Sequence, residues 1–337
     1  MAFLRVLTIF ILAIAAHSKL PSYNINPQQI TISGLSSGGF MAVQMHFAFS
    51  SIFKGAAIFA GGPFYCAQSS MISATTACMS SPSLIPLQSL ISKVQQLSDA
   101  GSIDSIDHLK NQNVFLFSGT ADTVVYQGVM QDLAAMYENF GAKTTKKFDL
   151  PAQHSFPTDN YGNQCNYQGE PYINNCGYNG AHEFYKVLYG SSLVAPIPEI
   201  DENLQNFDQS DYSSYTSSFH CKGYLYVPKK CQAGNSCGLH VALHGCLQTL
   251  DDISDGYVRH VGINEVAEAN DIIVLYPQIK KSILYPMNPN GCWDWWGYSD
   301  GFLSSGNYVT KKGVQMSALI QMIKDLGVKS DQELFNY

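Results

Sequence analysis

A serine lies between two glycines in the segment Gly34-Leu35-Ser36-Ser37-Gly38, which matches the pattern G-x-S-x-G. Residues 29–33 before it are β-prone, and residues 40–49 after it are compatible with a helix. A serine on such a strand-to-helix turn needs small neighbours, because the turn crowds the backbone. This context predicts Ser36 as a nucleophile. The alternatives are a Gly/Ser-rich loop without chemistry, and Ser37, which is off the centre of the motif.

The rest of the first half of the chain alternates apolar runs with helical periodicity. Residues 55–60, 113–117 and 144–150 have strand character, and residues 84–100 and 129–140 are compatible with helices. Strands that alternate with helices form a mostly parallel sheet with helices on both faces. Together with the serine turn, this alternation predicts an α/β-hydrolase fold.

Residues 155–218 break the alternation. They are rich in Asn, Tyr, Gly and Ser, and helical spacing occurs only around residues 181–188. We predict an irregular, cap-like segment beside the rim of the active site, and a disordered linker between two domains is the alternative. Regular structure resumes with strand candidates at 222–228, 239–243 and 271–276 and a helix over 313–326.

The order of these elements predicts a circular permutation. In the common α/β-hydrolase order, a strand with a following His-Gly turn precedes the nucleophile, and a helix leads into the nucleophile strand. Here the turn His244-Gly245-Cys246 lies far downstream of Ser36, and no strand follows the helix over 313–326. Joining the two ends of the chain would restore the usual order, and domain termini often lie close together. We therefore expect one catalytic domain over residues 19–337.

A serine hydroxyl needs a base to become a nucleophile, and the base needs an acid to orient it. Asp122 follows the strand over 113–117, and His154 follows the next strand. Because this fold has the chain order serine, acid, histidine, we predict Asp122 as the acid and His154 as the general base. Asp149 and His182 are the second choices. The alternatives without chemistry are a turn aspartate and an ordinary loop histidine.

Attack on an ester carbonyl places negative charge on its oxygen, which backbone N–H groups stabilise. We expect one donor from Ser37, the residue after the nucleophile, and the second from Cys246 in the His-Gly turn. All three tryptophans of the chain lie in one short segment after Cys292. Trp293, Trp295 and Trp296 are candidates for a substrate-binding wall, and packing in the core is the equal alternative.

The first eighteen residues have the pattern of a signal peptide. Arg5 precedes an apolar run over 6–16, and small residues near Ser18 suit cleavage. The run is shorter than the roughly 20 residues of a membrane-spanning helix, so a membrane anchor is the less favoured alternative. We expect residues 1–18 to be removed, and the mature protein to reach the extracellular space or the lumen of a digestive vacuole.

The cysteine count suits an oxidising compartment. Nine cysteines in a chain with an export signal are expected to form disulfides. Adjacent cysteines suggest the bridges Cys66–Cys78, Cys165–Cys176 and Cys231–Cys237, and Cys246–Cys292 is the candidate fourth, which would leave Cys221 free; the connectivity itself stays open. No C-x-x-C pair occurs and the histidines are not spaced like zinc ligands, so we expect no metal site and no cofactor.

The charge balance restricts the partners. A net charge of −7 argues against binding to nucleic acid or to anionic membranes. No segment after the signal peptide is apolar enough to span a bilayer, so we expect no integral membrane association. We expect a monomer that acts on a neutral ester.

Three segments carry a resemblance to a known family. They are GLSSGGFMA over 34–42, LHVALHGC over 239–246 and NGCWDWWGY over 290–298. These segments resemble the extracellular poly(3-hydroxybutyrate) (PHB) depolymerases, particularly the single-domain type, over nearly the whole mature chain.

The resemblance has implications for fold, site and activity. It implies the permuted hydrolase fold and hydrolysis of polyester or short hydroxyacid esters through an acyl-enzyme. It places the triad at Ser36, Asp122 and His154, and the oxyanion donors at Ser37 and Cys246. No Thr/Ser-rich linker or separate polymer-binding module is visible, so attachment to a solid polymer would depend on the catalytic domain's own surface.

Two other functions stay open from the sequence. A feruloyl or acetyl esterase acting on plant polysaccharide would use the same catalytic groups. A non-catalytic binding protein on a hydrolase scaffold is the other class, and it is disfavoured because all three triad positions are filled.

Overall fold

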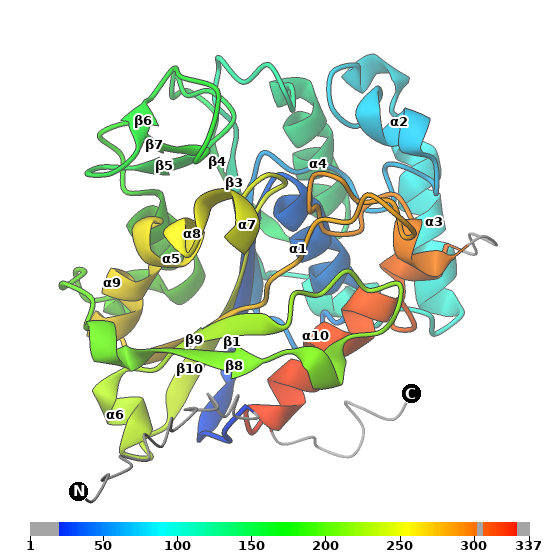
Figure 1. The fold of residues 1–337 in the computed structure, drawn as a ribbon. Coiled ribbons are helices and arrows are strands. Elements are labelled where there is room, and N and C mark those ends of the chain that lie inside the picture. Colours follow the sequence, from blue (N-terminus) through cyan, green and yellow to red (C-terminus); the bar gives the residue numbers. More distant parts are fainter. Residues whose placement is uncertain (1–19, 302–305, 329–337) are drawn as a thin grey trace, which may run out of the picture.

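An eight-stranded sheet forms the centre of the computed structural model, which describes residues 20–301 and 306–328 (Figure 1). The strand order is β4-β3-β2-β1-β10-β11-β9-β8. The strands are β1 (Ile25–Leu35), β2 (Gly55–Phe59), β3 (Asn113–Phe117), β4 (Lys143–Lys147), β8 (Leu204–Asp208), β9 (Lys222–Tyr226), β10 (Cys237–Leu243) and β11 (Ile272–Tyr276). The strands from β4 to β11 in this order run parallel, and β9 and β8 add an antiparallel edge.

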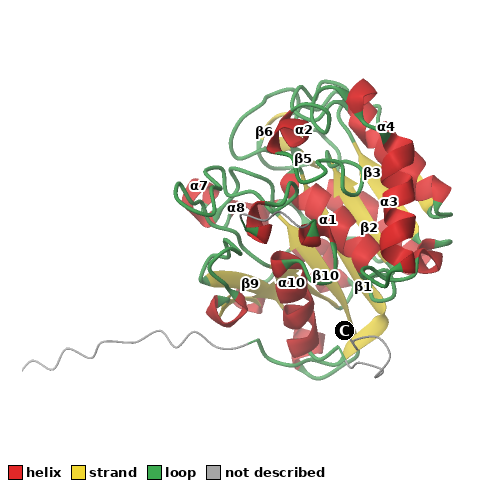
Figure 2. Cartoon of the chain, turned by 90° about the vertical axis from the view of Figure 1, so that its right-hand side faces the viewer, coloured by secondary structure: helices red, strands yellow, loops and turns green. Residues whose placement is uncertain are grey.

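Helices cover both faces of the sheet. One face carries α1 (Ser37–Ala48), α3 (Leu87–Asp99), α4 (Gln127–Asn139) and α10 (Val314–Asp325), as Figure 2 shows. The other carries α5 (Gly180–Tyr189), α8 (Gly256–His260) and α9 (Ile263–Ala269). Short helices α2 (Met71–Thr75), α6 (Lys229–Gln232) and α7 (Leu250–Ile253) lie in the connections. The predicted α/β-hydrolase fold with a mostly parallel sheet is confirmed.

The central strands are buried on both faces. The strand β11, with the sequence IIVLY, has every residue buried, as expected for a continuous apolar run inside a parallel sheet. The edge strand β4 reads KTTKK instead. Its lysines suit a sheet edge, because charged side chains there discourage pairing with another chain.

One histidine lies in the middle of the sheet. His240 on β10 is fully buried, and its two ring nitrogens lie 2.8 Å from the hydroxyls of Thr31 and Ser33 on β1. Phe184 stacks on the ring from α5. Burial lowers the pKa of His240 to about 3, so the ring is neutral and its polarity is satisfied by the two hydroxyls.

The two ends of the described chain lie side by side. The backbone N–H of Tyr23, just before β1, donates to the carbonyl of Leu326, just after α10, at 2.8 Å. The last helix therefore ends where the nucleophile strand begins, which is the arrangement that the permutation hypothesis requires. Residues 1–18, predicted as a signal peptide, lie outside the described residues.

Residues 155–218 contain more regular structure than the sequence predicted. They include a small parallel sheet of β5 (Phe156–Thr158), β7 (Ile173–Asn175) and β6 (Asn163–Gln164), and β8, which joins the large sheet. Strands of two to five residues are too short to produce a periodic pattern. The same reason explains why the helices α7, α8 and α9 were missed.

Four disulfides are present: Cys66–Cys78, Cys165–Cys176 and Cys231–Cys237, which the adjacency of the cysteines suggested, and Cys246–Cys292, the candidate fourth. The remaining thiol, Cys221, is exposed. Over residues 20–301 and 306–328, none of the helices has the length and apolar character needed to cross a bilayer.

Candidate active site

The nucleophile candidate lies on a strained turn at the end of β1. Ser36 has a φ of 55°, a backbone conformation that side chains rarely adopt, and α1 begins at the next residue. A Cβ on Gly34 would lie 2.1 Å from the carbonyl oxygen of Gly38, and a Cβ on Gly38 would lie 2.4 Å from the carbonyl oxygens of Leu243 and His244. Both glycines of the motif are therefore required, and the second allows α1 to begin against the end of β10.

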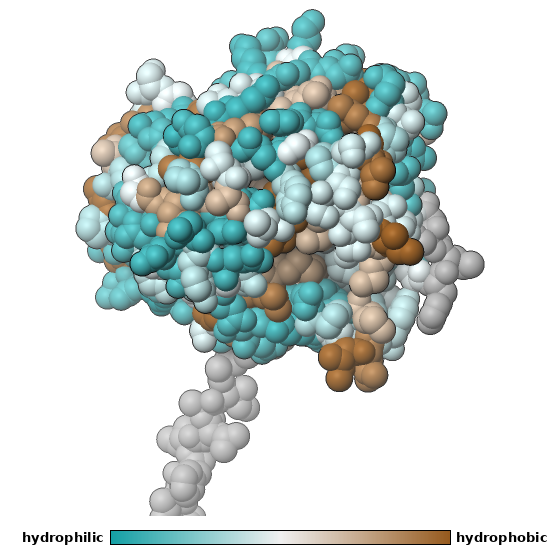
Figure 3. Space-filling view, turned by 90° about the horizontal axis from the view of Figure 1, so that it is seen from above, coloured by the Kyte–Doolittle hydropathy of each residue, from teal (hydrophilic) through white to brown (hydrophobic). Residues whose placement is uncertain are grey.

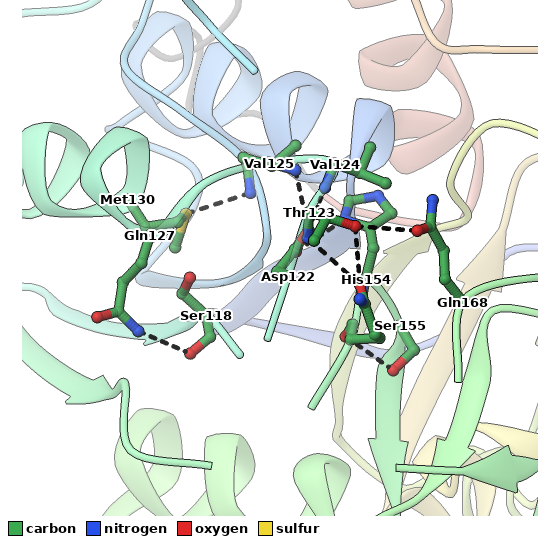
Figure 4. Close-up of polar contacts among 12 residues, drawn as sticks. Ser118, Asp122, Thr123, Val124, Val125, Gln127, Met130, His154, Ser155 and Gln168 are labelled. Carbon is green, nitrogen blue, oxygen red and sulfur yellow. Dashed lines mark hydrogen bonds and ion pairs between the residues drawn. The ribbon is translucent and has the colours of Figure 1, made fainter. Parts of the chain in front are cut away.

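Asp122 and His154 form the hydrogen-bonded pair predicted from their places at strand ends (Figure 4). Oδ2 of Asp122 lies 2.8 Å from Nδ1 of His154, and Oδ1 accepts from the backbone N–H groups of Val124 at 2.8 Å and Val125 at 2.9 Å. Both side chains are buried. The two backbone donors fix the carboxylate so that its other oxygen faces the imidazole. The proton of the neutral ring therefore lies on Nδ1, and Nε2 is left to accept a proton.

The loops that carry the acid and the base are fastened to each other. A Cβ on Gly119 would lie 2.0 Å from the carbonyl oxygen of Ala152, and Ala121 donates to the same oxygen at 3.2 Å. Oε1 of Gln153 accepts from the backbone N–H groups of Thr123 and His154, each at 3.3 Å. The position of the imidazole relative to the carboxylate is therefore set by backbone contacts as well as by their own bond.

Ser36 and His154 line one cavity of about 340 Å³. No hydrogen bond joins the side chains of Ser36 and His154 in this structure. The hydrogen bond between a catalytic serine and its base often tightens only when substrate binds. None of the other lining residues carries a formal charge. They are Leu35, Phe40, Met71, Ala74, Thr75, Met79, Val124, Val125, Gln168, Tyr172, Gly245, Cys246, Leu247, Gln248, Asn288, Pro289, Asn290, Cys292, Trp295 and Trp296. The cavity suits a neutral, partly apolar ligand.

Two backbone N–H groups are available near Ser36. Ser37 is the first residue of α1, where N–H groups have no partner within the helix and the helix dipole favours negative charge. The hydroxyl of Ser37 is buried and accepts from the backbone N–H of Trp293 at 3.3 Å, which gives it a structural contact. Cys246 lines the cavity, and among the described residues its backbone N–H has no acceptor. These are the two predicted oxyanion donors.

The histidine of the His-Gly turn is structural. Nε2 of His244 accepts from the backbone N–H of Ile279 at 3.2 Å, and Nδ1 donates to the carbonyl of Gly245 at 2.7 Å. Burial lowers the pKa of His244 to about 4. The neutral ring thus holds the turn that carries Cys246, and the disulfide to Cys292 fastens the same turn to the tryptophan segment.

The tryptophans divide between the core and the cavity. Trp293 is fully buried against Phe219 and does not line the cavity, so its prediction as a substrate-binding residue is wrong. Trp295 lines the cavity and stacks on Phe40, with 4.3 Å between ring centres. Trp296 also lines the cavity. Alternation would place Trp293 and Trp295 on the same side. The segment has no strand structure, so its packing decides which tryptophans reach the cavity, and the sequence alone did not resolve this.

The second-choice residues lie elsewhere. Asp149 has a side chain that is 77% exposed and pairs with Lys147, so it cannot orient a buried imidazole. His182 lies on α5 and is not among the lining residues. Within the described ranges, no group of three or more His, Cys, Asp or Glu side chains is placed to hold a metal ion.

Sequence reasoning missed much of the cavity wall. Residues of the α2 region lie in the loop that Cys66–Cys78 closes, and Gln168 and Tyr172 lie in the loop that Cys165–Cys176 closes. With Cys246–Cys292, three of the four disulfides border the cavity. The closely spaced cysteines were the available signal, but spacing does not show where a closed loop packs.

Comparison with known proteins assigns the family. The chain is 36% identical over 330 residues to "Polyhydroxybutyrate depolymerase" from Talaromyces funiculosus, covering 92% of this chain and 93% of that protein. The chain belongs to the PHB depolymerase family. It is also 43% identical over 319 residues to "Poly(3-hydroxybutyrate) depolymerase" from Delftia acidovorans, covering 92% of this chain but only 62% of that longer protein.

A solved structure agrees with this assignment, and one family model matches part of the chain. The fold matches that of a serine-to-alanine variant of a PHB depolymerase complexed with an R3HB trimer, with a TM-score of 0.82 and 34% identity, covering 92% of this chain and 98% of that one. Residues 11–170 match the family model described as "Prolyl oligopeptidase family" (Peptidase_S9). Thus the PHB depolymerase relatives match nearly the whole chain, whereas that model matches its first half.

Proposed function

We propose that this protein is a serine esterase that hydrolyses poly(3-hydroxybutyrate) or related short hydroxyacid esters. The observation that carries this proposal is the buried Asp122–His154 pair, whose histidine lines the same cavity as the serine of the β1–α1 turn. Membership of the family supports the polyester over a feruloyl or acetyl ester. A non-catalytic binding protein would have no need for the strained Ser36 turn, which costs about 1–3 kcal/mol.

In the proposed mechanism, His154 takes the proton of Ser36 as its oxygen attacks the ester carbonyl. The N–H groups of Ser37 and Cys246 stabilise the oxyanion. His154 then protonates the leaving alcohol, and an acyl-enzyme remains on Ser36. A water molecule that gives its proton to His154 releases the acid and restores the hydroxyl. Asp122 keeps the imidazole oriented through both steps.

The surface beside the cavity carries exposed apolar side chains, which favour binding to a solid polymer. Ile283, Leu284 and Met287 are 80%, 76% and 64% exposed and precede the lining residues 288–290. Met71 and Ile72 on α2 are 57% and 76% exposed, and Met71 reaches the cavity. We call these five residues the apolar rim. Figure 3 shows apolar groups standing out on this upper side of the molecule. Exposed apolar groups gathered around a cavity indicate a contact surface.

We further propose that the protein is secreted and acts as a monomer. Four disulfides fit an oxidising compartment, and the pattern of residues 1–18 supports export. No cofactor takes part in the proposed reaction, because the serine, the imidazole and the two N–H groups supply every proton transfer and charge contact that it needs.

The test uses Ser36→Ala with Ser37→Ala as its matched control. The wild type is expected to clear a PHB suspension and to hydrolyse a soluble hydroxybutyrate ester, and Ser36→Ala should lose both activities at an unchanged melting temperature. Ser37→Ala removes only the hydroxyl bonded to Trp293 and keeps the backbone N–H, so it should retain activity. A wild type that hydrolyses feruloyl esters but no hydroxybutyrate ester would refute the substrate, and an active Ser36→Ala would refute the mechanism.

A further inference from the structure

The turn that carries Cys246 needs support, because part of it is strained. Leu247 has a φ of 58°, which is unfavourable for a side chain of its kind. Its backbone N–H donates to the carbonyl of Asn290 at 2.8 Å, and the disulfide holds the neighbouring Cys246. Neither contact acts on Gly245, which joins the end of β10 to Cys246. The carbonyl of Gly245 shares its peptide unit with the Cys246 N–H and accepts from Nδ1 of His244 at 2.7 Å.

A second buried side chain holds the N–H of Gly245. Gln248 is 1% exposed, and its Oε1 accepts from the backbone N–H of Gly245 at 2.7 Å. Its Nε2 donates to the carbonyls of Pro171 at 2.8 Å and Tyr172 at 3.4 Å. The amide is thus engaged by protein groups on both sides, and no donor remains for a ligand although the residue lines the cavity.

The two successive N–H groups of this turn, on Gly245 and Cys246, differ in whether they have an acceptor. Gln248 accepts from the N–H of Gly245, whereas the next N–H, on Cys246, has no acceptor among the described residues. On its other side, Gln248 contacts the carbonyl of Tyr172, which also accepts from the backbone N–H of Phe156 at 2.9 Å, two residues after His154. Gln248 therefore lies between the oxyanion turn and the segment that carries the base.

We propose that Gln248 is a positioning residue for ester hydrolysis. By binding the N–H of Gly245, it keeps the N–H of Cys246 directed at the place where the ester oxyanion forms, and its link to residues 171–172 keeps that place in register with His154. This inference depends on the proposed function. It predicts an effect on the transition state, in which the oxyanion exists, and little effect on the binding of the uncharged substrate.

The test compares Gln248→Met with Gln209→Met. Gln209 is also fully buried and uses its amide in a similar way, donating to the carbonyls of His220 and Gln278 and accepting from the N–H of Gln278, but it lies outside the cavity lining. Both variants lose buried hydrogen bonds, so both should melt at a lower temperature. Only Gln248→Met should lose kcat on a soluble ester.

Inhibition by a boronic acid is a second measurement, and a purely structural role of Gln248 would not change its inhibition constant. The oxygen of Ser36 adds to boron and its proton passes to His154, so that the tetrahedral adduct places an oxygen where the ester oxyanion would lie. Removing one oxyanion donor entirely typically costs about 100–1,000-fold in kcat. For Gln248→Met, in which the donor is present but misdirected, we expect a loss of about tenfold or more, an equal rise in the boronate Ki, and a KM within about twofold of wild type.

The outcomes separate this inference from the proposed function. A wild type that hydrolyses the ester, with a folded Gln248→Met whose kcat and Ki are unchanged, would overturn the inference alone. An equal loss of kcat in Gln209→Met would also overturn it. If Gln248→Met does not fold, Gln248→Glu replaces it, because its carboxylate still accepts from Gly245 but cannot donate to the carbonyls of Pro171 and Tyr172. The proposal requires both sides of the amide, so the boronate Ki of this variant should rise about tenfold or more, and a Ki within about threefold of wild type in the folded variant would contradict the proposal.

Discussion

Replacing Asp122 by asparagine should abolish catalysis without unfolding the protein. In the wild type, Oδ1 of Asp122 accepts from two backbone N–H groups and Oδ2 faces Nδ1 of His154. An asparagine amide has only one oxygen. If its NH2 group faced the two N–H donors, both would lose their acceptor, at about 1–3 kcal/mol each. The oxygen therefore stays with the backbone, and the NH2 group turns toward His154.

This orientation reverses the tautomer of the base. An NH2 group beside Nδ1 donates to that nitrogen, so the ring proton moves to Nε2, which then has no lone pair to accept the proton of Ser36. The same change of tautomer in a serine protease lowers kcat by about 10,000-fold. We expect a loss of that order for Asp122→Asn on a soluble hydroxybutyrate ester, with a melting temperature close to that of the wild type.

The measurement is kcat per folded enzyme, with far-UV circular dichroism as the control for folding. Labelling of Ser36 by a serine-directed phosphonate should slow by a similar factor, because labelling also needs the base. Asp149→Asn is the matched control, since its exposed carboxylate contacts Lys147 instead, and it should leave kcat unchanged. A folded Asp122→Asn that keeps more than a tenth of the wild-type kcat would refute the assignment of the acid.

Three further outcomes are expected. Burial lowers the folded-state pKa of His46, His240 and His244 to about 4, 3 and 4. As pH falls below about 6.5 the unfolded chain therefore binds these protons first, and the free energy of unfolding should drop by up to about 1.4 kcal/mol per pH unit for each histidine, partly offset by Glu265, whose pKa burial raises to about 7. A urea midpoint that stays constant from pH 7 to 5 would contradict this prediction. Gly119→Ala places a Cβ 2.0 Å from the carbonyl oxygen of Ala152, so melting temperature and kcat should both fall. Gly256→Ala is the control, because its Cβ would have its nearest neighbour at 3.6 Å, and it should lower neither quantity. The double variant Ile283→Ser, Leu284→Ser should bind less to PHB granules in a sedimentation assay while hydrolysing the soluble ester normally, and undiminished binding would remove the apolar rim from the proposal.

The sequence predicted those parts of the site that depend on local pattern and on parallel-sheet geometry. Ser36 lies on a motif whose glycines are required by contacts of 2.1 and 2.4 Å. Asp122 and His154 each follow a strand, and the carboxyl ends of parallel strands meet at one edge of a sheet. Their 2.8 Å bond is the expected result.

The parts that the sequence did not predict depend on contacts between distant segments. The roles of Gln153 and Gln248 arise from bonds to backbone groups of other loops, and glutamine carries no pattern that marks such a role. Trp293 and Trp295 are both buried, and only Trp295 lines the cavity, which depends on how their segment packs. The edge strand β8 has no clear alternation, and it is defined by its pairing with β9.

The pairing of β1 with β10 has a consequence for biosynthesis. Ile32 on the first strand pairs with Val241 on β10, about 200 residues further along the chain. A nascent chain that has just left the ribosome up to residue 236 already carries the serine, the acid and the base, yet one side of its central strand has no neighbour and the turn with Cys246 does not exist. Because such a long-range contact forms late, the proposed active site is complete only when the last third of the polypeptide has been made, and fragments that stop earlier expose an apolar strand edge prone to aggregation.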